Sequence, residues 1–400
     1  MQPSYDVIVV GAGIHGAGVA QAAAAQGCSV LVLEQHGIAS GTSSRSSKLI
    51  HGGLRYLESH QFSLVRECLY ERDLLLRLAP ELVQLKDFVI PVYGHTSRRP
   101  GLIRLGLGAY ALLGGLGKNT RFHALKRQEW QRLDGLNLND LRQVFCYQDA
   151  QTDDAALTRA VLHSACDLGA DLAFPAALNK VQRHDSGCEV EFISQGRISH
   201  CQARVLVNAA GPWINHVMQK ISPPVMPLSI ELVQGTHLLI DAALEHGPYY
   251  LEAPQDQRAV FVMPWQGHLL LGTTETPYQG DPASVTPLPQ ECDYLLEVLQ
   301  HYFPRFSQQS VTLLDAFAGL RVLPLDMQSA FHRPRETELW LDDEQQPTVL
   351  GIYGGKLTAY RATAEKAVQR LSAVLPQRKA HADTRRISLH PVAVSQPEVP

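Results

Sequence analysis

Three glycines and one glutamate stand at the spacing of a dinucleotide-binding turn. Gly11, Gly13 and Gly16 follow a short apolar run at 7–10, and Glu34 lies 18 residues after Gly16. In such a turn the first glycine permits the sharp bend, the second lets the backbone approach a pyrophosphate, and the third lets a helix pack closely on a strand. A carboxylate at the Glu34 position binds ribose hydroxyls and disfavours a 2′-phosphate, hence NADP. The motif predicts a dinucleotide cofactor and leaves FAD and NAD open.

The neighbouring residues predict the strand–helix–strand unit that such a turn requires. Residues 7–10 and 29–33 are short apolar runs typical of buried parallel strands, and 17–26 is a helix of small residues that ends at Gly27. Further helices are predicted at 62–79, 153–168, 290–302 and 358–371.

The stretch from 225 to 275 carries strand signals without intervening helices. Apolar and β-branched runs recur at 230–233, 237–240, 259–263 and 269–271. We interpret this stretch as a mainly antiparallel sheet that forms a second lobe. Beyond Pro376 the chain is polar and basic, and we expect this tail to be loosely ordered.

The composition is that of a folded globular protein and speaks against several classes of function. Hydrophobic residues make up 45% and charged residues 18%, and a net charge of −4 gives no reason to expect nucleic-acid binding. The seven cysteines have no CxxC spacing and the 17 histidines form no HExxH pair, so we predict neither a disulfide framework nor a metal site. The N-terminus has no signal-peptide pattern, and we expect a cytoplasmic protein.

The segment from Thr42 to Glu58 decides between the cofactors. It reads TSSRSSKLIHGGLRYLE and closely resembles the signature of the FAD-dependent glycerol-3-phosphate dehydrogenases, which belong to the D-amino-acid-oxidase-like flavoprotein superfamily. Six further motifs match in the family's order, at 208–213, 234–237, 261–265, 272–275, 319–321 and 354–361. The resemblance covers about residues 4 to 372 and implies FAD as the cofactor.

The resemblance also implies an α/β fold, in which a Rossmann-type FAD-binding lobe carries an inserted, mainly antiparallel β-sheet substrate lobe. The predicted boundaries are 1–85, 150–225 and 310–375 for the FAD-binding lobe, 86–149 and 226–309 for the substrate lobe, and 376–400 for the tail. Members of this family usually have a further helical domain after the last helix, of which this sequence has no counterpart. They also usually have proline directly after the arginine that matches Arg321, where Val322 stands here.

The same resemblance assigns the catalytic roles. Oxidation of a secondary alcohol needs a base for the hydroxyl proton, a flavin to accept the hydride, and cations to hold an anionic substrate. His51 and His237 are the candidate bases, with His51 favoured and His237 as a substrate-orienting group or the alternative base; Arg321 is expected beside them. Taken alone, a histidine is as often a structural hydrogen-bonding group, and an arginine is usually part of a surface ion pair.

Two further sets of contacts follow from the resemblance. The substrate contacts are Arg55, Tyr56, Arg321, Arg335 and Lys356, with Arg333 close enough to take the place of Arg335. The cofactor contacts are Gly11, Gly13, Gly16, Glu34, Thr42, Ser43, Ser46, Ser47, Val181, Ala210, Gly211, Gly355, Lys356, Leu357 and Thr358. If the N-terminus of the helix at 358–371 points at the flavin, its dipole stabilises the reduced, anionic form.

The expected activity is oxidation of sn-glycerol 3-phosphate to dihydroxyacetone phosphate by hydride transfer to FAD, with electrons passed to quinone. One alternative is an oxidase of the same substrate that produces hydrogen peroxide. Another is an FAD dehydrogenase of a different small hydroxy or amino acid. A third, from another class, is a flavin-binding electron-transfer subunit without a substrate of its own.

Residues 98–127 form an apolar segment with basic flanks. The run from Leu105 to Leu116 lies between Arg98, Arg99 and Arg104 on one side and Lys118, Arg121, Lys126 and Arg127 on the other. Such a segment can lie in a membrane interface, and a buried helix with a solvated rim is the alternative. It is too short to span a bilayer. The family that the whole sequence resembles passes electrons to membrane quinone. We therefore favour peripheral attachment of the protein to the inner face of the cell membrane.

Overall fold

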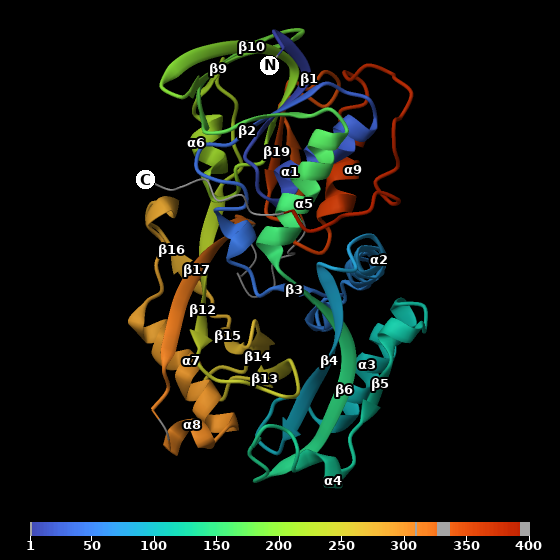
Figure 1. The fold of residues 1–400 in the computed structure, drawn as a ribbon, viewed down its shortest axis with the longest axis vertical. Helices are drawn as coiled ribbons and strands as arrows, with labels where there is room; N and C mark the ends of the chain where they lie inside the picture. Colours follow the sequence, from blue (N-terminus) through green and yellow to red (C-terminus); the bar gives the residue numbers. More distant parts are fainter. Residues whose placement is uncertain (1, 309, 326–336, 393–400) are drawn as a thin grey trace.

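The computed structural model describes residues 2–308, 310–325 and 337–392, which form two lobes, each built on one large sheet (Figure 1). Among the described residues the first sheet has nine strands in the order β11-β8-β9-β10-β1-β2-β7, with β19 beside β10 and β18 beside β19. Its strands are β1 (Ser4–Val10), β2 (Val30–Leu33), β7 (Asp171–Ala173), β8 (Ala176–His184), β9 (Gly187–Ser194), β10 (Arg197–Asn208), β11 (Ile221–Ser222), β18 (Glu338–Leu341) and β19 (Val349–Tyr353).

The centre of this first sheet is parallel and fully buried. Strand β1 pairs in parallel with β2 and β10, and β10 pairs in parallel with β19. Three helices cover one face, namely α1 (Ile14–Ala25), α5 (Asp154–Asp167) and α9 (Tyr360–Arg370) (Figure 1). The small residues of α1 let its neighbours approach closely: a Cβ atom on Gly18 would lie 2.9 Å from the Tyr360 ring of α9. The predicted strand–helix–strand unit is therefore confirmed.

The second sheet has ten strands among the described residues and is almost entirely antiparallel, as predicted. Its order is β16-β12-β15-β14-β13-β4-β6-β3, with β17 beside β12 and β5 beside β6. The strands are β3 (Leu49–Ile50), β4 (Val83–Tyr93), β5 (Phe122–Ala124), β6 (Leu141–Thr152), β12 (Ile230–Ile240), β13 (Tyr249–Glu252), β14 (Ala259–Trp265), β15 (His268–Gly272), β16 (Thr276–Tyr278) and β17 (Leu313–Pro324). The remaining helices are α2 (Phe62–Leu78), α3 (Pro100–Leu113), α4 (Arg127–Trp130), α6 (Ile214–Met218), α7 (Pro289–Tyr302) and α8 (Arg305–Gln308).

The predicted boundary at residue 310 is wrong. Strand β17 pairs antiparallel with β12 along its whole length, from Ile230 opposite Pro324 to Ile240 opposite Leu313. The segment 313–324 therefore belongs to the second sheet, because without it this edge of β12 would lack a hydrogen-bonding partner. Strands β4 and β6 likewise cross the predicted boundaries at 85 and 150 by a few residues.

The prediction of a loosely ordered tail is also wrong for residues 376–392. The C-terminal end of α1 leaves backbone carbonyls without helical donors, and the tail supplies donors for them. The His381 amide donates to the Ala25 carbonyl at 2.7 Å, and Arg378 Nη1 donates to the Gly27 carbonyl at 2.7 Å. Arg378 also pairs with Asp6 at 2.7 Å, and Leu389 is buried in the core beneath α2 and α9.

Candidate active site

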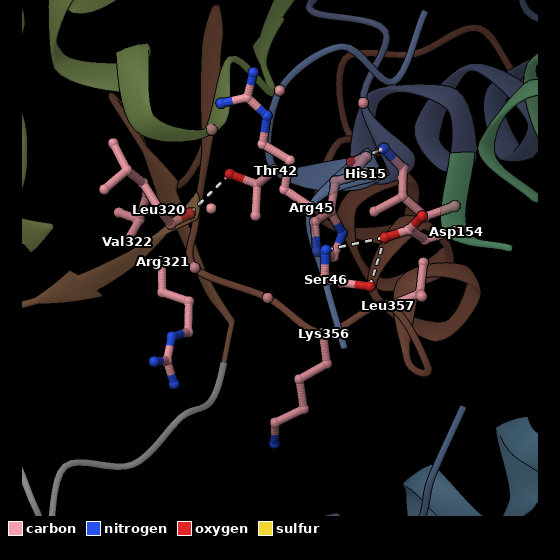
Figure 2. Close-up of a pocket in the computed structure, with 18 of the residues that line it drawn as sticks. His15, Thr42, Arg45, Ser46, Asp154, Leu320, Arg321, Val322, Lys356 and Leu357 are labelled. Carbon is pink, nitrogen blue, oxygen red and sulfur yellow. Dashed lines mark hydrogen bonds between the residues drawn. The ribbon is translucent and has the colours of Figure 1, made fainter. Parts of the chain in front are cut away.

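A cavity of about 700 Å³ lies where the two lobes meet. Its lining begins at Glu34, at the end of β2, passes the glycine turn at 11–16, and reaches Arg258 and Arg321 in the second lobe. Figure 2 shows side chains from the first lobe, such as Asp154 and Leu357, on one side of this cavity, and Arg321 on the other. The arrangement is that of a long binding site with a nucleotide end and a second, cationic end.

The glycine turn has the geometry that its sequence predicts. Gly11 adopts φ +101°, and a Cβ on Gly16 would lie 1.9 Å from the Gly11 carbonyl oxygen, so both positions require glycine. The Ile14 amide, at the start of α1, donates to Ser43 Oγ at 2.9 Å. Gly11 and Gly13 line the cavity, whereas Gly16 acts by packing. The N-terminus of α1 therefore borders the cavity, where its dipole favours phosphate.

Glu34 is fixed by the backbone. Its Oε2 accepts a hydrogen bond from the Ala12 amide at 2.8 Å, and its Oε1 accepts from the His36 amide at 2.8 Å and the Gly37 amide at 3.2 Å. A carboxylate has about four acceptor positions, so it can still accept from ribose hydroxyls. The position of Glu34 fits its predicted role.

The loop at 42–47 lines the cavity, and its hydroxyls are held by distant residues. Thr42 Oγ1 donates to the Leu320 carbonyl at 2.7 Å, and Ser46 Oγ donates to Asp154 Oδ2 at 2.6 Å (Figure 2). Asp154 is fully buried and also binds the Lys48 ammonium at 2.6 Å. Lys48 adopts φ +59°, which is uncommon for a non-glycine residue, and the ion pair holds it there.

The pair formed by Lys48 and Asp154 was not among the predicted site residues. Lys48 stands inside the matched segment 42–58, and acidic residues at the start of the helix at 153–168 are ordinary capping residues. Asp153 is indeed the cap, and its side chain accepts from the Ala156 amide at 2.9 Å. Nothing in the sequence distinguishes Asp154 as the residue that reaches the loop.

Ala210 and Gly211 line the cavity just after β10, but Val181 does not. Val181 lies opposite Val190 of β9 and beside Ile221 of β11, fully buried in the core of the first lobe. The residues of β8 that do line the cavity are Ala176 and Leu178, nearer its start. The prediction for Val181 is corrected accordingly.

The turn between β19 and α9 contributes Gly355, Lys356, Leu357 and Thr358 to the lining. Gly355 adopts φ +122°. Thr358 Oγ1 accepts a hydrogen bond from the His51 amide at 3.0 Å, so this turn is joined directly to the candidate base. Helix α9 begins two residues later than predicted, at Tyr360.

His51 lines the cavity from a loop that is anchored on both sides. The next residue, Gly52, donates its amide to Tyr110 Oη at 2.8 Å, and Tyr110 donates to Asp149 Oδ2 at 2.7 Å. Asp149 is paired in turn with the buried Arg72 at 2.9 Å. These buried charges hold the backbone around His51, which gives its imidazole a defined place.

His237 lies in β12 with its ring stacked on Phe317, at 5.1 Å between centroids and 14° between planes. Its Nε2 is 3.0 Å from Ser47 Oγ. Burial, together with the charges of Lys48 and Arg321, lowers the pKa of His237 to about 3. The imidazole is therefore neutral near pH 7, suited to hydrogen bonding and a weak proton acceptor. This charge state favours His51 as the base.

Three of the predicted cations, Arg55, Arg321 and Lys356, line the cavity. Arg55 and Tyr56 lie on a single 3₁₀ turn at Leu54–Leu57, and Lys356 Nζ is 4.2 Å from the centre of the Tyr56 ring. Arg321 Nη1 pairs with Glu275 Oε1 at 2.7 Å, and its Nη2 donates to the Thr274 carbonyl at 3.1 Å. Arg335 lies outside the described residues, as does Arg333.

Several lining residues were missed. Glu275 is the last residue of the matched motif 272–275, and Arg258 precedes the motif 261–265. Arg258 Nη1 donates to the Glu275 carbonyl at 2.8 Å, so it supports the segment that holds Arg321. The motif position was a usable signal for Glu275, whereas Arg258 lies outside the matched motifs.

A buried carboxylate fixes the same segment from behind. Glu291, on α7, accepts hydrogen bonds from the hydroxyls of Thr236, Thr274 and Thr276, at 2.6, 2.7 and 2.7 Å. Burial alone would raise its pKa, but these hydrogen bonds outweigh that effect and lower the pKa. Strand β12, which carries His237, and the segment that carries Glu275 are thereby both hydrogen-bonded to helix α7.

Comparison with known proteins assigns the class. The sequence model of the family described as FAD dependent oxidoreductase matches residues 6–361. The glycerol-3-phosphate dehydrogenase of Pseudomonas aeruginosa is 38% identical over 372 residues, covering 92% of this chain and 71% of that protein. The D-erythritol 1-phosphate dehydrogenase of Brucella abortus is 35% identical over 379 residues, covering 93% of this chain and 74% of that protein.

A solved structure gives the same fold. The glycerol-3-phosphate dehydrogenase from Bacillus halodurans, complexed with FAD, superposes with a TM-score of 0.75 at 24% identity, covering 97% of this chain and 68% of that chain. The fold and the cavity define a two-lobed flavoenzyme. The chain belongs to the FAD dependent oxidoreductase family, and its cofactor is FAD. The glycine turn, the fixed carboxylate of Glu34 and the turn at Gly355 suit this dinucleotide.

Proposed function

We propose that this enzyme oxidises the secondary alcohol of sn-glycerol 3-phosphate to dihydroxyacetone phosphate. The observation that carries the proposal is that three cations, Arg55, Arg321 and Lys356, line the FAD cavity together with His51 and His237. Several cations at one place suit a phosphate group, and an imidazole beside them suits the proton of an alcohol. The names of the relatives support the same substrate.

Each residue has a distinct task in this proposal. Arg55, Arg321 and Lys356 bind the phosphate dianion, and Glu275 keeps the Arg321 guanidinium oriented. His51 accepts the hydroxyl proton as the C–H bond is broken, while the neutral His237 hydrogen-bonds the substrate and orients it. When bound, FAD supplies the acceptor for the hydride. The loop that carries Ser46 and Ser47 lines the same cavity.

A longer polyol phosphate is the second candidate. The relative from Brucella abortus, named for D-erythritol 1-phosphate, is nearly as similar to this chain as the relative from Pseudomonas aeruginosa, at 35% against 38% identity. Both substrates share a phosphate and a secondary alcohol. The test is kcat/KM for the two compounds under the same conditions. We expect glycerol 3-phosphate to be preferred, and a higher value for the four-carbon substrate would reverse the assignment.

We further propose that a quinone takes the electrons, with oxygen as the rival acceptor. The substrate-reduced enzyme, mixed anaerobically with a soluble ubiquinone analogue, should reoxidise much faster than in air-saturated buffer. Faster reaction with oxygen, with stoichiometric hydrogen peroxide, would make the protein an oxidase. A flavin that no polyol phosphate reduces would favour an electron-transfer subunit.

Peripheral attachment to the inner face of the cell membrane is also proposed, and α3 supports it. Leu102, Leu105 and Leu112 share one face of this helix and are 56, 70 and 67% exposed, and Leu116 just beyond it is 70% exposed. The opposite face is buried through Leu107, Tyr110 and Ala111. An amphipathic helix with an apolar outer face suits the headgroup region of a bilayer. No helix of the described residues has the length and hydropathy to cross a membrane.

The basic flank is smaller than the sequence implied. Arg98 is paired with Glu58 and Glu252, so its charge is offset, whereas Arg99, Lys118 and Arg121 are exposed. Flotation with phosphatidylglycerol vesicles tests the attachment. We expect the double variant Leu105→Glu/Leu112→Glu to lose vesicle binding, and the control Ile198→Glu, at an exposed apolar residue of β10, to retain it. Equal binding by both would exclude α3 as the contact.

A further inference from the structure

His15 is a half-buried titratable residue inside the glycine turn for which the proposed reaction has no role. It lies between Gly13 and Gly16, in the first turn of α1, and it lines the cavity. Figure 2 places its side chain at the side of the pocket opposite Arg321. Its neighbours therefore include the Gly355–Thr358 turn, and Arg321 lies on the far side of the pocket.

The imidazole fits against the turn that precedes α9. A Cβ atom on Gly355 would lie 1.9 Å from His15 Nε2, 2.7 Å from Cε1 and 2.8 Å from Cδ2. The Nε2 edge of the ring therefore occupies the space above the Gly355 α-carbon. His15 bridges the phosphate-binding turn of the first βα unit and the Gly355–Thr358 turn, both of which line the FAD cavity.

The hydrogen-bonding state of the ring follows from its surroundings. Nδ1 is buried and has no hydrogen-bond partner among the described residues. Burial lowers the pKa of His15 to about 4, so the ring is neutral near pH 7 and carries a single N–H. An unpaired buried N–H is rarer in proteins than an unpaired acceptor, which favours leaving Nδ1 as the lone pair. The proton then resides on Nε2, which, unlike Nδ1, is not a fully buried unpaired atom, in a residue that lines the cavity.

We propose that His15 is an FAD-binding residue whose Nε2–H donates a hydrogen bond to an oxygen of the bound cofactor. The N-terminus of α1 already favours the anionic part of FAD at this place, and the imidazole adds a neutral donor beside it. The same ring sets the position of the Gly355 turn by contact. The proposal rests on FAD binding alone and stands or falls independently of the substrate.

Three variants separate the ring nitrogens from simple packing. Glutamine places an amide nitrogen near the position of Nε2, asparagine places its polar atoms near Nδ1, and methionine fills the space without a donor. We expect the His15→Gln apoprotein to bind FAD within about threefold of the wild type, and His15→Asn and His15→Met to bind about tenfold more weakly, the factor of one hydrogen bond. Fluorescence titration of the apoproteins with FAD measures these constants.

His163→Met is the matched control, because His163 is an exposed residue of α5 that pairs with Asp167 on the surface. The melting temperatures of the apoproteins identify any variant that fails to fold. If one of the three variants does not fold, the FAD affinities of the other two can still be compared. Wild-type FAD affinity in both His15→Met and His15→Asn would show that the His15 side chain contributes by packing alone and makes no hydrogen bond to FAD. Rescue by asparagine but not by glutamine would move the hydrogen bond to Nδ1 and overturn the proposed tautomer.

Discussion

The two ends of the cavity are built from different parts of the chain. The FAD end is formed largely by backbone: glycines at 11, 13 and 355, the start of α1, and a carboxylate held by three amides. The substrate end is formed by charged side chains, each held by a partner that is distant in sequence. Arg321, for example, is held by Glu275, 46 residues earlier in the chain.

This difference determines how each end should respond to mutation. A backbone-built site has little tolerance for an added side chain, because the backbone cannot move without moving α1. A site built from paired side chains loses affinity when one cation is removed and keeps the fold. Substitutions at the two ends, and in the segments that support them, should therefore differ in the size of their effects.

The first change is Gly16→Ala at the FAD end. The new Cβ would lie 1.9 Å from the Gly11 carbonyl oxygen, so α1 must shift away from the phosphate turn. We expect FAD to bind at least about 100-fold more weakly, or about 3 kcal/mol, as measured by titration of the apoprotein. Gly101→Ala, where nothing lies within 4 Å of the added Cβ, is the control. Normal FAD affinity in Gly16→Ala would contradict the backbone-built site.

The second change is Arg321→Ala at the substrate end. It removes a cation that we propose to bind the phosphate, and it leaves the Glu275 carboxylate without this partner. We expect kcat/KM for glycerol 3-phosphate to fall about 100-fold, given the strength of hydrogen bonds between charged groups. FAD content should stay at the wild-type level, and Arg142→Ala, at an exposed arginine, should be neutral. Loss of FAD along with activity would show that the two ends are not separable.

The third change is Glu291→Gln, which weakens the hydrogen bonds between α7 and the threonines beside His237 and Glu275. An amide group cannot accept at both positions, so threonine hydroxyls lose an acceptor, and we expect unfolding to be easier by about 2 kcal/mol. Urea denaturation measures the free energy of unfolding, and Glu297→Gln, on the exposed side of α7, is the control. Equal stability of both variants would show that the buried carboxylate is not a support.

The same variant gives a pH test with a definite sign. The pKa of Glu291 is lowered in the folded protein, so the unfolded chain binds this proton more readily. Its stabilisation is complete above the unfolded pKa of about 4.3 and is lost as the pH falls through the folded pKa. As the pH falls below about 4.3, the wild type should lose more stability than Glu291→Gln. Parallel curves would rule out this linkage.

The smallest effect is expected for Arg378→Ala in the segment that packs on α1. The side chain of Arg378 is 45% exposed, so solvent screens its ion pair with Asp6, and the loss should stay below about 1 kcal/mol. FAD affinity should not change, because the FAD end is formed by the glycine turns and Glu34. A loss of FAD in this variant would mean that the tail contributes to the FAD end as well.

The FAD end could be predicted from the sequence because its information is local. The spacing of Gly11, Gly13 and Gly16 and the acidic residue at 34 specify one turn and its flanking elements. The strand signals of 225–275, which have no helix between them, likewise indicated an antiparallel sheet, which β12 to β16 confirm.

The other features of the fold and the site depend on pairings between segments that are distant in the sequence, and no local pattern encodes such pairings. The membership of β17 in the second sheet follows from its pairing with β12, about 80 residues earlier. Asp154 reaches Lys48 across 106 residues, and Arg378 reaches Asp6 across 372. The Val181 assignment failed because the lining of β8 lies nearer its start, and the sequence gives no indication of which part of the strand borders the cavity.

The central claim is that one cavity holds FAD and the phosphate-bearing alcohol together, in position for hydride transfer. Anaerobic titration of the FAD-loaded protein with sn-glycerol 3-phosphate, followed by flavin absorbance near 450 nm, tests this claim most directly. We expect prompt bleaching at substrate concentrations that leave Arg321→Ala oxidised. A flavin that stays oxidised with glycerol 3-phosphate, but is reduced by dithionite, would contradict the claim.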